Sequence, residues 1–348
     1  MFGLSKEVME KVEKYSPIFT KIYKNCLKAK GEEVIIISDY GYENSILSSM
    51  MGYGYYHAAK QEGLKANLLF QEPKKGFMQA DNNVLKALER LEKKNIVILA
   101  VSNKLGKFGK TNSFRGFCHQ QGHRFISSTG LGDVKSSYFE LFIEAMNINY
   151  ARMKRRGAVI KKKWDKASTI TVKTEAGTNL TFNVEGKESI SNVGDYYEEG
   201  KGGNMPCGEV YIPPKGFEGV EGTAVIDASM KTDNGAILLQ EPVTLTIQKG
   251  IVTNIVGKKA HRLEASIKKF QYRANYPQRV RMIGELGIGI NPGAVIIGSM
   301  IMDEKVMGTG HIALGSNYWF GGSIKTIFHG DQVFNNPTYY LDGKKMEF

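Results

Sequence analysis

The stretch Glu33-Val-Ile-Ile-Ile-Ser38 is a short, continuous apolar run rich in β-branched residues. Such a run is typical of a strand that is buried on both faces of a parallel sheet. Three further segments have a similar character: Lys65-Ala-Asn-Leu-Leu-Phe70, Asn95-Ile-Val-Ile-Leu-Ala-Val101 and Arg124-Phe-Ile-Ser-Ser128. The sequence therefore predicts four strands in the first part of the chain.

Two segments between these strands have apolar residues at helical spacing, residues 45–63 and residues 83–94. Strands separated by helices of this length predict a parallel sheet with right-handed crossovers. We therefore expect an α/β, Rossmann-like N-terminal domain with a mainly parallel sheet over residues 1–156. The turn Asp39-Tyr-Gly-Tyr-Glu43 lacks the Gly-x-Gly-x-x-Gly fingerprint, so this sheet need not bind a dinucleotide.

The pattern changes after Lys166. Ser168-Thr-Ile-Thr-Val-Lys173 and Leu180-Thr-Phe-Asn-Val184 alternate in polarity and flank a glycine-bearing turn, which predicts a β-hairpin. Strand-like runs and glycines continue to the C-terminus, with one predicted helix over residues 258–272. We expect a mixed, sheet-rich α+β catalytic domain over residues 157–348.

The formal net charge of +12 raises the question of nucleic-acid binding. The densest basic stretch is Arg152-Met-Lys-Arg-Arg156, followed by Lys161-Lys-Lys163. Nucleic-acid binders usually interleave such charges with aromatic residues, whereas here Trp164 stands alone. We interpret the stretch as the solvated end of a helix and expect no nucleic-acid partner.

Composition bears on where the protein works. No run approaches the roughly 20 apolar residues that a bilayer-spanning helix needs, and the N-terminus begins directly with a charged helical pattern. The cysteines Cys26, Cys118 and Cys207 are widely spaced and odd in number, which argues against a disulfide framework. We expect a cytoplasmic protein without a membrane partner.

Residues 209–331 contain several oxygen and imidazole donors in short, glycine-punctuated segments. The candidate metal ligands are Glu209, Glu285, His311, Tyr318, His329 and Asp331. Two imidazoles, three carboxylates and a phenol are too many donors for one tetrahedral zinc ion, and they suit two divalent ions with a shared bridge. This inventory points to metal-assisted hydrolysis.

Individual residues support this interpretation to different degrees. Glu285 lies in an otherwise apolar, glycine-rich run, where a buried carboxylate is costly unless a cation or strong donors meet it. His329 and Asp331 are two residues apart, so on a strand they share one face. Glu209 lies on a proline-bracketed loop, and the pair His119 and His123 is interpreted as structural because Gly122 ends their helix.

Four segments of the chain resemble the M29 family of metallo-aminopeptidases, the thermophilic aminopeptidase T/S group. They are Asn204-Met-Pro-Cys-Gly-Glu-Val210, Gly284-Glu-Leu-Gly-Ile-Gly289, Gly308-Thr-Gly-His-Ile-Ala-Leu-Gly315 and His329-Gly-Asp331. The resemblance covers most of the chain and fills all six ligand positions. Cys207 differs from the small or acidic residue that the family often has there.

The resemblance implies a cytoplasmic aminopeptidase that removes N-terminal residues from short peptides. Two divalent ions (cobalt, zinc, manganese or magnesium) would activate a water molecule, and the protein would be a homodimer. The catalytic residues would be Glu209, Glu285 and Tyr318, either of the acids serving as general base or anchoring the substrate amine. Tyr318 would act as a ligand or as an oxyanion donor.

Two alternatives remain. His311, His329 and Asp331 by themselves form a set of two histidines and one carboxylate, the arrangement of non-haem iron oxygenases. The 2,5-dihydroxypyridine ring-cleaving dioxygenases are distantly similar to M29 proteins and use such a set. Glu209 and Glu285 favour the dinuclear peptidase, because a single iron has no evident need of them. The second alternative is a non-catalytic binding protein on a peptidase scaffold.

Overall fold

A computed structural model describes residues 3–108 and 113–347. The chain divides into two compact units, which we treat separately. Unit 1 consists of residues 1–150 and 194–207, and unit 2 of residues 151–193 and 208–348. The sequence predicts one boundary near residue 156, which falls inside a helix. It also gives no hint that the segment 194–207 returns to the first unit.

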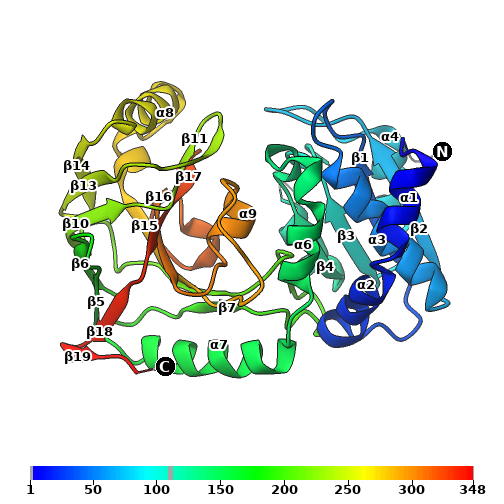
Figure 1. Cartoon of the computed structure of the whole chain (residues 1–348), viewed down its shortest axis with the longest axis horizontal. Helices are drawn as coiled ribbons and strands as arrows, with labels where there is room; N and C mark the ends of the chain where they lie inside the picture. Colours follow the sequence, from blue (N-terminus) through cyan, green and yellow to red (C-terminus); the bar gives the residue numbers. More distant parts are fainter. Residues whose placement is uncertain (1–2, 109–112, 348) are drawn as a thin grey trace. The chain divides into compact units, whose positions relative to one another are not determined.

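Unit 1 is an α/β unit built on a five-stranded parallel sheet in the order β2-β1-β3-β4-β8 (Figure 1). Its strands are β1 (Val34–Asp39), β2 (Ala66–Gln71), β3 (Ile96–Ala100), β4 (Arg124–Ser128) and β8 (Gly202–Gly203). The four predicted strands are confirmed. The fifth, β8, comes from the returning segment and pairs with β4 through Phe125 and Ile126.

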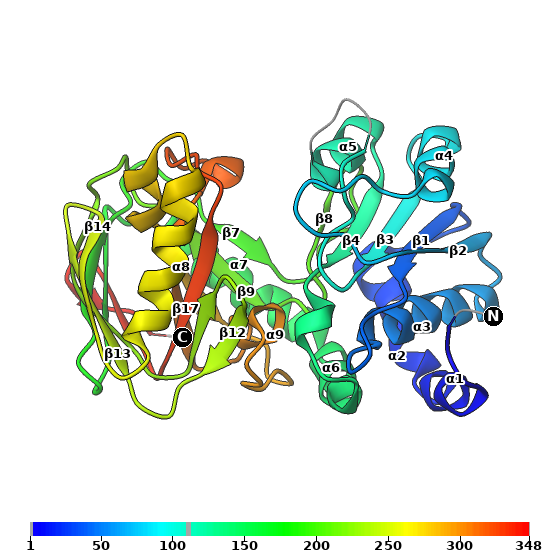
Figure 2. The same cartoon turned by 90° about the horizontal axis from the view of Figure 1, so that it is seen from above.

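Helices cover both faces of this sheet, with α4 and α5 on one face and α1, α2, α3 and α6 on the other (Figure 2). The helical segments are α1 (Lys6–Glu13), α2 (Ser16–Ile22), η1 (Tyr23–Leu27), α3 (Leu47–Gln61), α4 (Asn82–Arg90), α5 (Phe114–Gln121), η2 (Leu131–Asp133), η3 (Ser136–Tyr138) and α6 (Phe139–Met146). Gly122 ends α5 in the left-handed conformation, φ +70°, as expected. The centre of the sheet is a continuous apolar layer because β1 and β3 are fully buried.

Unit 2 is rich in antiparallel strands arranged in two seven-stranded sheets. The first has the order β14-β13-β10-β6-β5-β18-β19, with β5 (Thr169–Lys173), β6 (Asn179–Asn183), β10 (Val220–Ile226), β13 (Val243–Gln248), β14 (Ile251–Val256), β18 (Thr338–Leu341) and β19 (Lys344–Lys345). The second has the order β12-β11-β17-β16-β15-β9-β7, with β7 (Ile190–Asn192), β9 (Glu209–Ile212), β11 (Ser229–Thr232), β12 (Gly235–Leu238), β15 (Ile283–Gly289), β16 (Thr309–Gly315) and β17 (His329–Asn335). The predicted hairpin is β5–β6.

Helices and short turns complete unit 2. They are α7 (Tyr150–Trp164), α8 (Ala260–Arg273), η4 (Pro277–Arg281), α9 (Met300–Asp303) and η5 (Tyr318–Phe320). Trp164, completely buried at the end of α7, packs on Tyr339 of β18 with ring centroids 5.6 Å apart. The helix α8 packs beside β11 and β14 (Figure 2). The predicted fold class, a parallel α/β unit and a sheet-rich α+β unit, is confirmed.

Among the helices of residues 3–108 and 113–347, none is both long and apolar enough to span a bilayer.

Candidate metal centre

Neighbouring strands of the second sheet bring the predicted ligands together. Glu285 of β15 lies opposite Ala313 of β16, and Ala313 lies opposite Asp331 of β17. His311 of β16 is two residues before Ala313 and therefore points to the same face of the sheet. Glu209 is the first residue of β9, on the other side of β15. Residues separated by up to 122 positions in sequence thus meet through antiparallel pairing.

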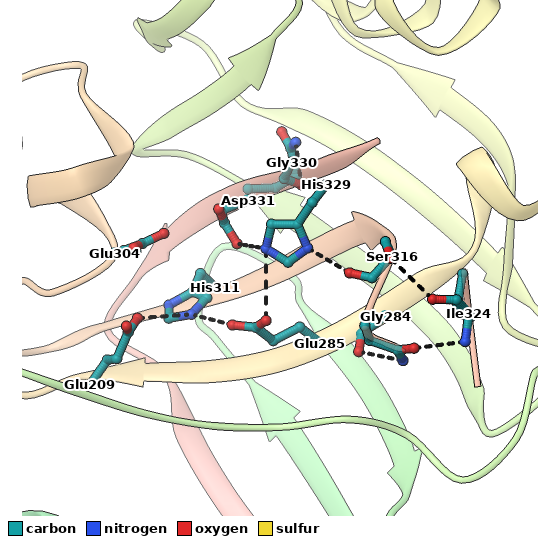
Figure 3. A network of polar contacts seen from close by, with 12 residues as sticks. Glu209, Gly284, Glu285, Glu304, His311, Ser316, Ile324, His329, Gly330 and Asp331 are labelled. Carbon is teal, nitrogen blue, oxygen red and sulfur yellow. Dashed lines mark hydrogen bonds and ion pairs between the residues drawn. The ribbon is translucent and has the colours of Figure 1, made fainter. Parts of the chain in front are cut away.

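His329 and Asp331 lie two apart on β17, as the sequence predicts for a strand. Their side chains converge on the cluster, where His329 Nε2 is 3.4 Å from Asp331 Oδ1 (Figure 3). His329 is 26% exposed at its side chain, whereas the Asp331 side chain is 10% exposed. His329 is therefore the more solvent-accessible member of the pair.

Glu285 lies between the two imidazoles. His311 Nε2 is 3.3 Å from Glu285 Oε1, and His329 Nε2 is 3.8 Å from Glu285 Oε2 (Figure 3). His311 Nε2 is also 3.8 Å from Glu209 Oε2. Ligand atoms of Glu285, His311 and Asp331 all lie within 4.8 Å of one another, a spacing that one ion can span.

The glycines of β15 make room for His311. Gly287 lies directly opposite His311 in the β15–β16 register. A Cβ atom at position 287 would lie 1.9 Å from His311 Nε2, so the imidazole lies over the bare backbone of the glycine. The glycine-rich pattern around Glu285 thus has a steric cause.

The cluster residues fit a divalent metal ion. Ser316 O accepts a hydrogen bond from His329 Nδ1 at 2.8 Å, which leaves the lone pair on Nε2, the atom that faces Glu285 and Asp331. Asp331 Oδ1 is buried without a hydrogen-bond partner among the described residues. An oriented imidazole and an unsatisfied carboxylate oxygen at one point are what a bound cation would satisfy.

The carboxylates of the cluster also favour a positive charge beside them, as the pKa values of the two imidazoles show. Burial alone would lower the pKa of His311, but Glu285, Glu209 and Asp331 outweigh it and raise this pKa to about 9. Burial is likewise outweighed at His329, where Asp331 and Glu285 raise the pKa to about 10. Burial raises the pKa of Glu285, and the nearby Asp331 carboxylate raises it further. The carboxylates therefore favour a cation at the position of the imidazole nitrogens.

Glu209 has a counter-ion within the protein. Lys305, which is completely buried, donates a hydrogen bond from Nζ to Glu209 Oε1 at 2.8 Å and also pairs with Glu304. Asn192 Nδ2 donates to the same Glu209 oxygen at 3.0 Å. One carboxylate oxygen of Glu209 is therefore committed to other partners, and Glu209 is bound less directly to the cluster than its neighbours.

Tyr318 is placed differently from the other five predicted residues. It begins η5, is 61% exposed, and has Lys325 Nζ 5.2 Å from its ring centroid. Within the described residues, no hydrogen bond joins its hydroxyl group to the cluster. The structure thus brings together Glu209, Glu285, His311, His329 and Asp331, while Tyr318 lies in the adjoining turn.

Sequence reasoning missed three residues of the site, Glu304, Lys305 and Ser316. Lysine is abundant along the whole chain, so nothing marks Lys305 as buried. Ser316 acts through its backbone carbonyl, which leaves no trace in residue type. The segment Asp303-Glu304-Lys305, only six residues before His311, is the one signal that could have been followed.

A buried imidazole and carboxylate cluster on an antiparallel sheet, in a chain that also has a parallel α/β unit, defines a two-unit protein suited to a divalent metal. The model of one family, described as NicX, 2,5-dihydroxypyridine 5,6-dioxygenase, matches residues 142–347. Because this match covers more than half of the chain, including every cluster residue, the protein belongs to that family.

Individual relatives agree with this assignment. A curated 2,5-dihydroxypyridine 5,6-dioxygenase from Pseudomonas putida KT2440 is 29% identical over 207 residues, 55% of this chain and 56% of the relative. The match therefore spans about half the length of that relative. The solved structure of a 2,5-dihydroxypyridine dioxygenase from the same organism is similar with a TM-score of 0.71 at 20% identity, covering 95% of this chain and 94% of the other.

A second solved structure, wild-type AmpT from Thermus thermophilus, is similar with a TM-score of 0.67 at 14% identity. It covers 95% of this chain and 96% of the other. AmpT is an M29 aminopeptidase, so the predicted resemblance to M29 proteins holds for the fold. At this identity it carries no argument about activity.

The comparisons correct the predicted function. The expectation of an aminopeptidase, a peptide hydrolase of family M29, is wrong, because the family match and the curated relative both name a ring-cleaving dioxygenase. The expectation of two divalent ions (cobalt, zinc, manganese or magnesium) is wrong with it, because it depends on the peptidase function that the dioxygenase family contradicts. The structure offers a physical reason, because Glu209 pairs with Lys305 and Tyr318 lies outside the cluster.

Proposed function

We propose that this protein is a ring-cleaving dioxygenase that holds one ferrous ion through His311, His329 and Asp331 and opens a dihydroxylated pyridine ring. The observation that carries the proposal is the convergence of these side chains. His311 and Asp331 offer ligand atoms within 4.8 Å of each other, and His329 Nε2 lies 3.4 Å from Asp331 Oδ1. Two imidazoles and one carboxylate are the ligand set of non-haem iron oxygenases, which leaves coordination positions open. The family match supports the same chemistry.

When bound, the iron would supply a site at which dioxygen and a hydroxyl group of the substrate meet and exchange single electrons. Cleavage between ring carbons 5 and 6 adds both atoms of one O₂ to the ring. The ring itself supplies the electrons, so the reaction needs no external reductant. One O₂ is therefore consumed for each ring opened.

The residues around the ion have separate tasks. Ser316 fixes the ring of His329 by accepting its Nδ1 proton, so that Nε2 is available as a ligand. Glu285 is 5% exposed and lies within 4 Å of both imidazoles. Because Glu285 lies beside both imidazoles and is not one of the three proposed ligands, it is the carboxylate placed to accept the hydroxyl proton of the substrate.

Oxygen consumption tests the proposal. Protein reconstituted with ferrous iron should bind one iron per chain and consume O₂ and 2,5-dihydroxypyridine in equal amounts. It should release no p-nitroaniline from aminoacyl-p-nitroanilides. Peptidase activity, or two ions per chain with no oxygen uptake, would refute the proposal.

Two variants separate the ligands from the base. His329→Ala should lose its iron and lower the rate on the order of 100-fold or more, while His261→Ala, an exposed histidine on α8, should behave like the wild type. Glu285→Gln should keep its iron and lose turnover. If Glu285→Gln loses its iron as His329→Ala does, Glu285 is a ligand and not the base.

A further inference from the structure

Two exposed aromatic side chains lie in the short turn after β16, and one of them, Trp319, contacts the metal cluster. Tyr318 is 61% exposed and Trp319 is 54% exposed, although both belong to a turn that follows directly on β16. The Trp319 ring centroid lies 4.8 Å from that of His329, at an interplanar angle of 68°. His329 is a proposed ligand whose side chain is 26% exposed, so Trp319 lies on the solvent-accessible side of the cluster.

The turn that carries Trp319 is fixed to the strand that carries Glu285. Asn317 is completely buried, and its Nδ2 donates to the Gly284 carbonyl at 2.9 Å while its Oδ1 accepts from Ile324 N at 2.7 Å (Figure 3 shows Gly284 and Ile324). A Cβ atom at Gly322 would lie 2.0 Å from Asn317 Cγ, so the turn closes tightly over this side chain. The position of Trp319 relative to Glu285 is therefore set by a rigid element.

The neighbouring ring strengthens this placement. Phe320 is 6% exposed and packs edge-on against Tyr211 of β9, with ring centroids 5.2 Å apart. Trp319 contacts Phe320 at 5.3 Å, also in a T-shaped arrangement. T-shaped contacts to His329 and Phe320 hold the indole ring, and Trp319 stays 54% exposed.

We propose that Trp319 is a substrate-binding residue whose indole face stacks on the aromatic ring of the substrate at the metal centre. This inference rests on the proposed function and deepens it, because it assigns the residue that selects a planar, electron-rich ring. The Trp319 and His329 ring centroids lie 4.8 Å apart, and paired aromatic rings lie about 4.5–7 Å apart, so a substrate ring held at the metal beside His329 comes within reach of the indole. Leaving a large apolar ring such as Trp319 54% exposed to water is unfavourable, and a bound substrate ring would cover it.

Tryptophan fluorescence offers a direct test, because the chain has only two tryptophans. Trp164 is completely buried against Tyr339, so a ligand in the cluster contacts Trp319 and not Trp164. Iron-loaded protein without oxygen is titrated with 2,5-dihydroxypyridine, and with oxalate as a metal-binding anion that has no aromatic ring. The pyridine should quench the emission, and oxalate should leave it nearly unchanged.

Variants of Trp319 complete the test. Trp319→Leu should raise KM for the ring about three- to tenfold, the contribution of one aromatic pair, with kcat changed less than about threefold. Trp319→Phe should restore KM and lose the quenching signal. Unchanged KM in Trp319→Leu, or a change in oligomeric state with no change in KM, would overturn the inference.

Failure of the inference and failure of the proposed function can be told apart. If the wild type consumes oxygen with 2,5-dihydroxypyridine but its tryptophan fluorescence does not change when this compound binds, only the assignment of Trp319 is wrong. If the wild type neither binds nor oxidises the ring, the proposed function fails, and the inference fails with it.

Discussion

Lys305 shows how much a single buried charge depends on its neighbours. Its ammonium group is fully buried and pairs with Glu209 and Glu304. In Lys305→Met the carboxylates lose this counter-charge but stay buried. We expect the free energy of unfolding to fall by about 3–5 kcal/mol, the usual result of breaking a buried pair from one side. Chemical denaturation of the metal-free protein measures this change.

A double variant provides the matched control for Lys305. Lys305→Met combined with Glu209→Gln removes one of the stranded charges. It should therefore be more stable than Lys305→Met alone by about 1 kcal/mol or more. A single Lys305→Met variant as stable as the wild type would contradict a structural role for this ion pair.

The residue types in the sequence predict most of the cluster, but they do not predict the buried lysine that neutralises its carboxylates. Glu285, His311, His329 and Asp331 could be found because acids and imidazoles in glycine-rich, apolar segments are costly without a common partner. Lys305 could not, since its burial is decided by carboxylates that come from β9 and from the end of α9. Without the Lys305–Glu209 ion pair, the sequence presents Glu209 as a free metal ligand, and this favours the wrong number of metal ions.

At the scale of elements, the close approach of β15 and β16 positions His311. Gly287→Ala places a methyl group where the His311 ring lies, 1.9 Å from Nε2. The ring must leave its place, so we expect the affinity for ferrous iron to fall on the order of 100-fold, with activity falling in step. Metal titration of the purified variant measures the affinity.

Gly116→Ala is a suitable control for Gly287→Ala. Gly116 lies inside α5, where a Cβ atom would make an ordinary contact 3.6 Å from Ser113 Cβ. This variant should keep the iron affinity of the wild type and gain slightly in stability, because alanine favours a helix by about 1 kcal/mol over glycine. Normal iron binding in Gly287→Ala would show that β15 and β16 can separate more easily than the structure indicates.

The β3–β4 region should respond to pH through His123. This side chain is completely buried, and burial lowers its pKa below the ordinary value of 6.5. Asn95 N donates to His123 Nδ1 at 3.2 Å, which requires the neutral ring. Below about pH 6.5 the unfolded state binds the additional proton, so stability falls by up to about 1.4 kcal/mol per pH unit until the native pKa is reached.

Variants at the two histidines of this region isolate the effect. Urea denaturation between pH 5 and pH 7.5 should show a smaller slope of stability against pH in His123→Gln than in the wild type. His119→Gln should keep the slope of the wild type, because His119 is exposed at the end of α5. An identical slope in all three proteins would assign the pH dependence to other groups.

Strands and helices of unit 1 could be predicted more closely than those of unit 2. The apolar runs of β1, β3 and β4 are bounded by polar residues and match the structure within about a residue. In unit 2, glycines fall inside strands as well as between them, as in β15 and β16, so strand ends are not marked in the sequence. Pairing between distant strands, which forms the cluster, is not encoded locally.

For the whole molecule, the division into units depends on contacts that no local pattern reveals. The segment Gly194–Cys207 belongs to unit 1 because β8 pairs with β4 there. β8 contains only Gly202 and Gly203, which have no side chain to form a strand pattern. Sequence therefore predicts the two fold classes correctly and misses the second crossing of the chain between units.

This division predicts how iron should change thermal unfolding. All the proposed iron ligands belong to unit 2, and each unit has its own buried sheet. A ligand that binds only the native state stabilises it by about 4 kcal/mol when its free concentration is 1,000 times its Kd. We therefore expect calorimetry to show two unfolding transitions. Iron should raise the transition temperature of unit 2 and leave that of unit 1 unchanged. Chelator should reverse the shift, and His329→Ala should not show it. A shift of equal size in both transitions, or a single merged transition, would mean that the two units unfold as one.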